Sequence, residues 1–192
     1  MEKIGNSKSS LYVALMLCFC IFTFEGCFGR TKTPYVTEQY SFEYNTPSIV
    51  SEGRIDASVK IERFSVNQSY SSQAMVYRAL PYRLSVYNYS RWRTSPGDMV
   101  TDFLTRDFLA SNIFAAVFSY RDLEGARFIV EGGIEEFLES FENDKWNAVL
   151  KVNVSFIDDS EKEITKRVIF QKRYYYKELL KEHSPDEFAR GM

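Results

Sequence analysis

The side chains that could carry out nucleophilic or acid–base chemistry are few in this chain. His183 is the only histidine, so a Ser–His–Asp or Cys–His arrangement has one possible base, and a site with several histidine ligands has none. Cys18, Cys20 and Cys27 all precede residue 28, which excludes a disulfide-stapled scaffold and a cysteine-based metal site in the rest of the chain. We therefore expect no enzyme activity, no cofactor and no metal, and we interpret His183 as a surface residue.

A cluster of acidic residues offers an alternative with a defined chemistry. Two carboxylates at a fixed separation across a cleft can hydrolyse a glycosidic bond. A solvated strand face explains the same glutamates without any cleft, and we favour it, so an envelope-anchored glycan hydrolase stays as an alternative. The cluster consists of Glu131, Glu135, Glu136, Glu139 and Glu142.

Aromatic and cationic residues alternate in the short segment 87–93. Trp, Tyr and Arg are enriched at binding hot spots, and loops held by rigid elements often carry contacts. Because the segment stands between a predicted strand and a predicted helix, we interpret it as a loop that binds a partner. Packing of Trp92 in the core is the rival interpretation. The predicted partner-binding residues are Tyr89, Arg91, Trp92 and Arg93.

Charge and length limit the function class. Lys and Arg total 24 against 26 Asp and Glu, so the formal net charge is −2 and nothing neutralises a phosphate backbone. Nucleic acid is therefore not expected as a partner. The 192 residues, 45% of them hydrophobic, are enough for one domain with a packed core.

The N-terminal segment has the plan of a signal peptide. Two lysines precede the uncharged run 11–24, which is shorter than the roughly 20 residues that a membrane-spanning helix needs. Gly26 and Cys27 end this run as in a bacterial lipobox, which predicts that Cys27 is lipidated. An ordinary cleavage site and an uncleaved anchor are the alternatives.

This division predicts three parts. Residues 1–26 form a lipoprotein signal peptide, residues 27–38 a tether, and residues 39–192 a single folded domain. A short polar tether spaces a domain from the membrane.

Alternation of apolar and polar residues recurs along the domain. At 55–62 it is clean and predicts a half-buried strand with one wet face. The segment 126–142 fits either a helix or a strand, and we favour a bulged strand that contains Gly132 and Gly133. Further strands are predicted at 40–44, 74–79, 83–87, 146–157 and 164–176.

Capping residues mark two helix starts. Ser95, Pro96 and Asp98 supply an N-cap hydroxyl, a proline at the first helical position and an early carboxylate, which predicts a long helix that stops at Asn112. Ser184 opens a capping box for a second helix, which we expect to be truncated by the end of the chain. We predict an α+β fold, with a mixed or largely antiparallel sheet and one long and one C-terminal helix packed on it. The apolar stripe of the long helix is Val100, Phe103, Leu104 and Phe108.

Several short motifs follow the lipobox-like start: Tyr89-Ser-Arg91-Trp92, then Pro96 and a helix, Phe128-Ile-Val-Glu131, Phe141-Glu142, and an alternating strand closed by Asp158. Together they resemble the ABC-type transport auxiliary lipoprotein family over roughly residues 40–192. The chain departs from the family in the stretch after Trp92, where Arg93-Thr-Ser replaces an acidic, proline-rich loop.

The resemblance implies a function in lipid transport, because these lipoproteins accompany MCE-type transport systems. The implied protein is a non-catalytic, lipid-anchored accessory subunit of an envelope ABC/MCE-type transporter, and the transporter moves phospholipid or other hydrophobic solutes between membranes. Its implied partners are the MCE-domain protein and the ABC permease and ATPase of the same system, or a second copy in a homo-oligomer. It is anchored by its acylated cysteine in the cell envelope of a Gram-negative bacterium, facing the periplasm from the outer membrane. A periplasmic lipid carrier is the other alternative, and it requires an apolar cavity large enough for an acyl chain.

We predict that Cys27 is the acylated N-terminus of the mature protein. A single acyl chain binds a membrane only marginally, whereas several chains anchor a protein stably. Mass spectrometry of the mature N-terminus measures this directly, with Cys27→Ser as the control that cannot be acylated at this position. An unmodified Cys27 or an intact Met1 would contradict the prediction.

Overall fold

Strands dominate the part of the chain that the structure describes. The computed structural model describes residues 35–48 and 53–192, of which 49% lie in strands and 19% in helices. The strands are β1 (Glu38–Tyr40), β2 (Ile55–Ile61), β3 (Ser65–Val66), β4 (Ala74–Leu80), β5 (Arg83–Trp92), β6 (Phe114–Ser119), β7 (Phe128–Glu142), β8 (Lys145–Asp158) and β9 (Val168–Leu179). The helices are the 3-10 turn η1 (Gln68–Tyr70), α2 (Pro96–Ser111), α3 (Ile164–Arg167) and α4 (Pro185–Gly191).

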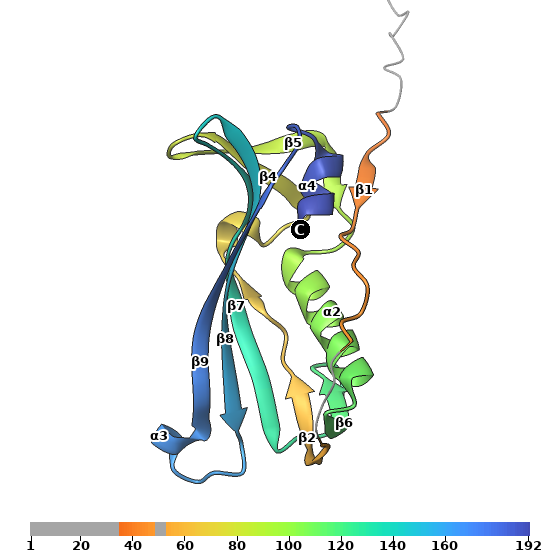
Figure 1. Ribbon diagram of the computed structural model, residues 1–192, viewed down its shortest axis with the longest axis vertical. Helices are drawn as coiled ribbons and strands as arrows, with labels where there is room; N and C mark the ends of the chain where they lie inside the picture. The colour runs from red at the N-terminus through yellow and green to blue at the C-terminus, as the bar shows by residue number, and fades with distance from the viewer. Residues whose placement is uncertain (1–34, 49–52) are drawn as a thin grey trace, which may run out of the picture. The chain divides into compact units, whose positions relative to one another are not determined.

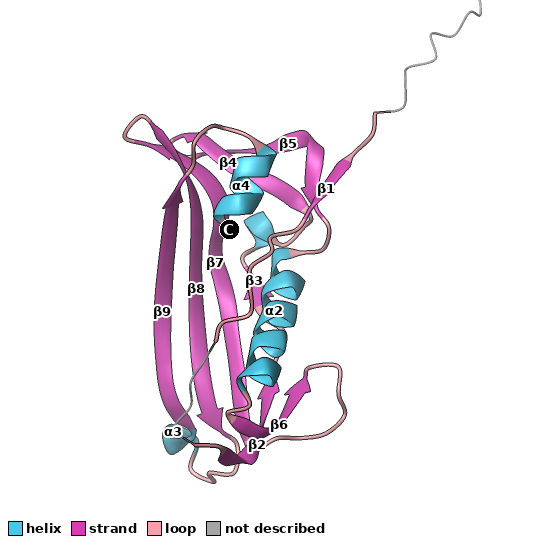
Figure 2. Ribbon diagram, turned by 45° about the vertical axis from the view of Figure 1, so that its right-hand side comes forward, coloured by secondary structure: helices cyan, strands magenta, loops and turns pink. Residues whose placement is uncertain are grey.

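The sheet is organised around β7. One edge of β7 pairs antiparallel with β8 along its whole length. The other edge is shared by three parallel partners, β2 at its start, β3 in its middle and β4 towards its end. Beyond these, β6 joins β2, β5 joins β4, β1 joins the far edge of β5, and β9 joins β8 (Figure 1). Helix α2 runs alongside the long strands, with β2 and β6 at its lower end (Figure 2).

The predicted fold class is wrong. We expected an α+β fold with helices packed on a mixed or largely antiparallel sheet, and the structure has one curled, mixed sheet of half-barrel form with little helix. Parallel pairs join β7 to β2, β3 and β4, whereas the pairs β4–β5, β7–β8 and β8–β9 are antiparallel. The physical reason for the curl is length. Strands of 15 and 14 residues accumulate enough right-handed twist to wrap the sheet.

Most strand predictions are confirmed. The ambiguous segment 126–142 forms β7, and its register shifts between Ile134 and Glu136, just after the glycine pair, as expected of a bulged strand. Strand β5 runs further than predicted. The strand expected at 40–44 is shorter and lies earlier, as β1, and the segment 164–176 begins with the single turn α3 before β9.

Both predicted helix starts are confirmed. The Ser95 hydroxyl accepts a hydrogen bond from the Asp98 backbone N–H at 3.3 Å, and α2 ends at Asn112, whose φ of 53° is a left-handed conformation that asparagine tolerates. The Ser184 hydroxyl accepts from the Glu187 backbone N–H at 3.2 Å and caps α4. Within the described part of the chain, no helix is long and apolar enough to cross a membrane.

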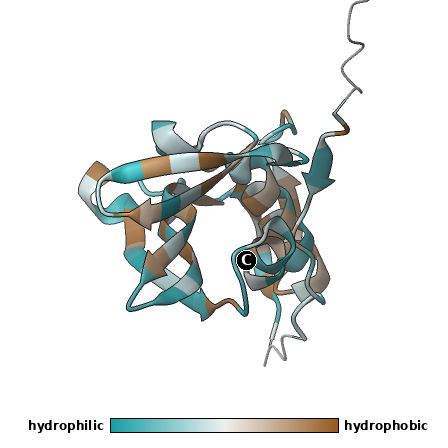
Figure 3. Ribbon diagram, turned by 90° about the horizontal axis from the view of Figure 1, so that it is seen from above, coloured by the Kyte–Doolittle hydropathy of each residue, from teal (hydrophilic) through white to brown (hydrophobic). Residues whose placement is uncertain are grey.

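Trp92 lies at the centre of the larger core cluster and has no exposed surface. Its ring centroid lies 6.5 Å from that of Phe42, 5.3 Å from that of Phe137 and 5.1 Å from that of Phe188. These rings come from the segment after β1, from β7 and from α4, so Trp92 joins both ends of the described chain to the sheet. Seen from above, hydrophobic and hydrophilic residues alternate along the strands (Figure 3).

A second core cluster packs where Phe64 crosses β7 at Gly132. A Cβ at Gly132 would lie 2.4 Å from the Phe64 ring and 2.3 Å from the Asn153 carbonyl oxygen, so no side chain fits there. The glycine is thus required by the close approach of an aromatic ring. The buried members of this cluster are Val59, Ile61, Phe64, Phe114 and Val130.

Replacing Trp92 by alanine should lower the free energy of unfolding by about 3–5 kcal/mol, because the cavity left by the indole borders three aromatic rings. Urea denaturation of the two proteins measures the difference. Arg91→Ala, at an exposed position on the same strand, is the matched control and should change stability by no more than about 0.5 kcal/mol. A Trp92→Ala variant as stable as the unchanged protein would contradict the burial of this residue.

Candidate ligand-binding groove

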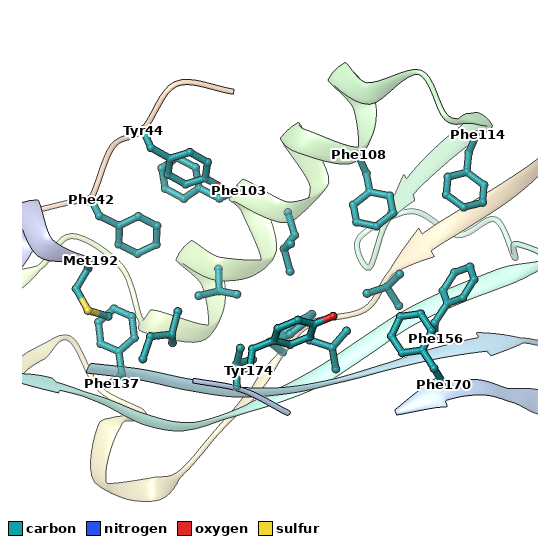
Figure 4. Close-up of a pocket in the computed structure, with 17 residues that line it drawn as sticks. Phe42, Tyr44, Phe103, Phe108, Phe114, Phe137, Phe156, Phe170, Tyr174 and Met192 are labelled. Carbon is teal, nitrogen blue, oxygen red and sulfur yellow. The ribbon is translucent and has the colours of Figure 1, made fainter. Parts of the chain in front are cut away.

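An apolar groove of about 550 Å³ lies between α2 and the inner face of strands β7 to β9 (Figure 4). Side chains from α2 and from the segment after β1 point toward side chains that rise from the strands. We call this space the apolar groove. Its lining residues are Phe42, Tyr44, Phe64, Val100, Phe103, Leu104, Phe108, Phe114, Val130, Phe137, Leu150, Val152, Val154, Phe156, Phe170, Tyr174 and Met192.

Two periodicities bring these residues together. On α2, apolar residues spaced three and four apart share one helix face, and the stripe predicted from the sequence is the face that lines the groove. On β8, alternate residues from Leu150 to Phe156 point to one side of the sheet and form the floor. The groove exists because these two apolar faces oppose each other with space left between them.

The lining offers almost no polar chemistry. Its only side-chain oxygens are the hydroxyls of Tyr44 and Tyr174. The Tyr44 hydroxyl donates to Asp107 at 2.6 Å, and burial together with that hydrogen bond raises the pKa of Tyr44 to about 12, so the phenol is neutral at physiological pH. A pocket with these walls suits a hydrocarbon chain, because apolar surface is the main contribution that it makes to binding.

The wall on the α2 side is held in place by Arg106. Its guanidinium lies 4.5 Å from the Tyr44 ring centroid and 4.6 Å from that of Phe103, and it pairs with Asp107 at 2.8 Å. The rings of Tyr44 and Phe103 stack at 5.1 Å. These contacts fasten the segment after β1 onto α2, so residues far apart in the chain form one continuous wall.

Strand β9 forms the wall on the other side, and this strand is exposed to solvent. Every residue of this strand is exposed, and among the described strands it pairs only with β8. Phe170 and Tyr174 nevertheless line the groove, because alternate residues of β9 share the inner face with the floor of β8. The groove is therefore bordered by an edge strand along one side.

A buried polar cluster lies near the end of β7. The Glu139 carboxylate has no exposed surface, accepts a hydrogen bond from the Tyr87 hydroxyl at 2.6 Å, and lies 3.0 Å from His183 Nδ1. His183 also stacks on Trp146, with ring centroids 3.9 Å apart. One interpretation from the sequence is wrong here, because Glu139 is not on a solvated face. His183 is an exposed residue, as expected, with a side chain that is 34% exposed and contacts this cluster.

This cluster affects the groove through α4. His183 stands directly before the Ser184 cap of α4, and Met192 after α4 lines the groove. Burial raises the pKa of Glu139, and the hydrogen bonds from Tyr87 and His183 oppose that rise. The cluster thus ties the chain before α4 to β7 and positions one end of the apolar groove.

The other glutamates of the acidic cluster lie nearer the surface. Three of them each pair with a different cation, and Glu131 is exposed. The pairs are Glu135 with Arg173 at 2.9 Å, Glu136 with Lys151 at 3.3 Å, and Glu142 with Lys177 at 2.6 Å. These three carboxylates are thus partly exposed members of ion pairs on the sheet.

The predicted partner-binding residues lie in a strand and not in a loop. Tyr89, Arg91 and Trp92 belong to β5, and Arg93 follows it directly. Tyr89, Arg91 and Arg93 are exposed, so their predicted contact with a partner stays a prediction. Trp92 is fully buried, and its indole Nε1 has no hydrogen-bond partner among the described residues, so it is a core residue and presents no surface to a partner.

Cys27, the predicted lipidation site, lies outside the described residues, as do the signal peptide and most of the tether. Most of the groove residues were placed in strands or helices from the sequence, Phe64 and Phe114 being exceptions, and none was predicted to bind a ligand. Apolar periodicity identifies a face that avoids water, and it does not reveal whether the opposing face lies in contact or at a distance.

Comparison with known proteins gives a fold. No protein-family model and no curated protein matches the chain. A Xanthomonas campestris protein of the family DUF330 matches with a TM-score of 0.71 and 16% identity, covering 80% of this chain and 84% of that one. An uncharacterised protein matches with a TM-score of 0.58 and 10% identity, covering 79% of this chain and 88% of that one. A hypothetical protein from Chlamydia trachomatis matches with a TM-score of 0.50 and 12% identity, covering 69% of this chain and 78% of that one.

These comparisons correct the predicted family. The resemblance to the ABC-type transport auxiliary lipoprotein family is not supported, because no family model matches and the short motifs that carried it are found here as ordinary parts of strands and caps. The chain is similar to a DUF330 protein in fold, at an identity too low to carry function across.

Glu139→Gln tests the buried cluster through pH. Because burial raises the pKa of Glu139, its contribution to stability is fully present below the ordinary carboxyl value of 4.5 and is lost as pH rises through the raised value. Glutamine does not titrate, so the stability of the variant relative to the unchanged protein should increase as pH rises.

Urea denaturation between about pH 4.5 and 8 measures the difference in the free energy of unfolding between the variant and the unchanged protein. The pH dependence of this difference reports the difference in proton binding between the folded and unfolded states. Glu131→Gln, at an exposed position of the same strand, is the control and should show a smaller dependence. A difference for Glu139→Gln that stays constant with pH would contradict the raised pKa.

Proposed function

We propose that this protein is a non-catalytic, lipid-anchored accessory protein of an envelope lipid-transport system, and that it holds the acyl chain of a lipid in the apolar groove. The observation that carries the proposal is the groove itself: about 550 Å³ lined by 17 residues, with two tyrosine hydroxyls as the only side-chain oxygens. The lipobox-like Gly26–Cys27 supports the anchor.

The size of the groove supports an acyl ligand. Ligand pockets commonly range from roughly 300 to 1,000 Å³. Each buried methylene contributes about 0.8 kcal/mol, so about ten of them contribute roughly 8 kcal/mol before the entropy of association is subtracted. A hydrocarbon chain needs no polar partner in the walls, and the lining has almost none.

The accessory role rests on the lipid anchor that the lipobox-like Gly26–Cys27 predicts. An anchored protein with an open groove presents its ligand close to a membrane. The partners that we propose are an MCE-domain protein and the ABC permease and ATPase of its system, in the periplasm-facing envelope of a Gram-negative bacterium. A homo-oligomer is compatible with this arrangement.

A periplasmic lipid carrier is the second candidate, and the same groove favours it. The two differ in their freedom to move. A carrier has to cross the periplasm with its lipid, whereas an acylated Cys27 restricts the protein to one membrane.

Photo-crosslinking in cells tests the groove. Phe170 lines the groove, and Tyr175 lies on the opposite face of the same strand. We expect the full-length protein with benzoylphenylalanine in place of Phe170 to form lipid adducts on irradiation, detectable by mass spectrometry, because its reactive group lies against the bound chain. The same replacement at Tyr175 should give few lipid adducts, because that side chain points away from the groove.

A second variant separates binding from membrane proximity. Val152→Trp fills the floor of the groove and should reduce the adducts at position 170, while the protein's abundance is followed by blotting. Equal adducts at 170 and 175, or no effect of Val152→Trp in a protein of normal abundance, would reject the groove as a lipid site.

A further inference from the structure

We propose that the apolar groove selects amphiphiles with an anionic headgroup, and that Lys172 on β9 binds that headgroup. The inference rests on the proposed lipid-binding function and specifies its ligand class: an acyl chain in the groove, and a carboxylate or phosphate at its open edge.

Lys172 lies at the edge of the groove. It stands between Phe170 and Tyr174 on alternate positions of β9, and all three therefore share the face that lines the groove. Across the sheet it pairs with Val154, which belongs to the groove floor. The Lys172 ammonium lies 4.9 Å from the ring centroid of Tyr174, so its charge is held beside a lining residue.

The charge of Lys172 is unused within the described structure. The other two cations of β9 point to the opposite face and pair with carboxylates, Arg173 with Glu135 at 2.9 Å and Lys177 with Glu142 at 2.6 Å. No carboxylate of the described residues lies within 4 Å of the Lys172 ammonium. The strand thus neutralises its outer cations and leaves the one on the groove face available.

The opposite wall does not compete for this charge. Arg106 on the α2 side pairs with Asp107, and Asp107 also accepts the Tyr44 hydroxyl. The lining itself contains no acidic side chain. An anionic headgroup at the β9 edge would therefore meet a cation without displacing a carboxylate, in a charge-assisted hydrogen bond, which is about twice as strong as a neutral one.

The test compares the lipids captured at position 170 with those of the whole envelope. In the full-length protein, with Tyr174 and Lys172 intact, anionic lipids should be enriched up to about fivefold among the adducts relative to the envelope, which is the effect that one solvent-exposed ion pair supplies. Mass spectrometry separates fatty acids from anionic phospholipids, so it identifies whether the headgroup is a carboxylate or a phosphate.

Charge variants identify the residue responsible. Lys172→Gln should return the adducts to the lipid composition of the envelope, while Lys172→Arg should preserve the enrichment. Lys145→Gln, which removes one charge at the hairpin between β7 and β8, is the matched control and should have no effect.

The outcomes separate the two proposals. Lipid adducts with the composition of the envelope in every variant would leave the groove as a lipid site and overturn the selection by Lys172. Enrichment that survives Lys172→Gln would overturn the role of Lys172. The absence of any adduct at position 170 would overturn the proposed function and this inference together.

Discussion

The structure depends on the pairing of β7 along both of its edges. One edge pairs with β8 along the whole strand, while the other edge is divided among β2, β3 and β4. All four of these strands therefore take their register from β7. A shift by one residue would turn Val130 and Phe137 out of the groove and place their polar neighbours inside. The continuous pairing with β8 also transmits the twist that curls the sheet, and the space beside α2 follows from that curl.

The two ends of the described chain pack against the sheet at Trp92. Phe42 after β1 and Phe188 of α4 both pack on Trp92, while His183 before α4 is fastened to the buried Glu139. These contacts join residues that are 50, 96 and 44 positions apart in the sequence, so they form only in the folded chain. The residue types that most suggested chemistry, the single histidine and a glutamate of the acidic cluster, thus serve packing, and the surface that suits a ligand is made of residues with no reactive group.

Local signals predicted local structure well. The Ser95 and Ser184 caps, the left-handed stop at Asn112 and the bulged strand near Gly132 were all predicted correctly, because each depends on a few neighbouring residues. The same reasoning failed where a distant contact decides. Trp92 was taken for a docking residue because nothing near it in sequence shows that Phe137 and Phe188 surround it.

The sequence by itself determined which segments form strands and helices, which of their faces avoid water, and that the chain carries a lipobox-like start. Only the tertiary structure decided that the faces of α2 and β8 oppose each other across a space, that Glu139 is buried, and that Lys172 borders the groove. The physical reason is that periodicity reports the direction of a side chain relative to its own element. The distance between two faces depends on sheet curvature and strand order, which arise from pairings between residues far apart in the chain.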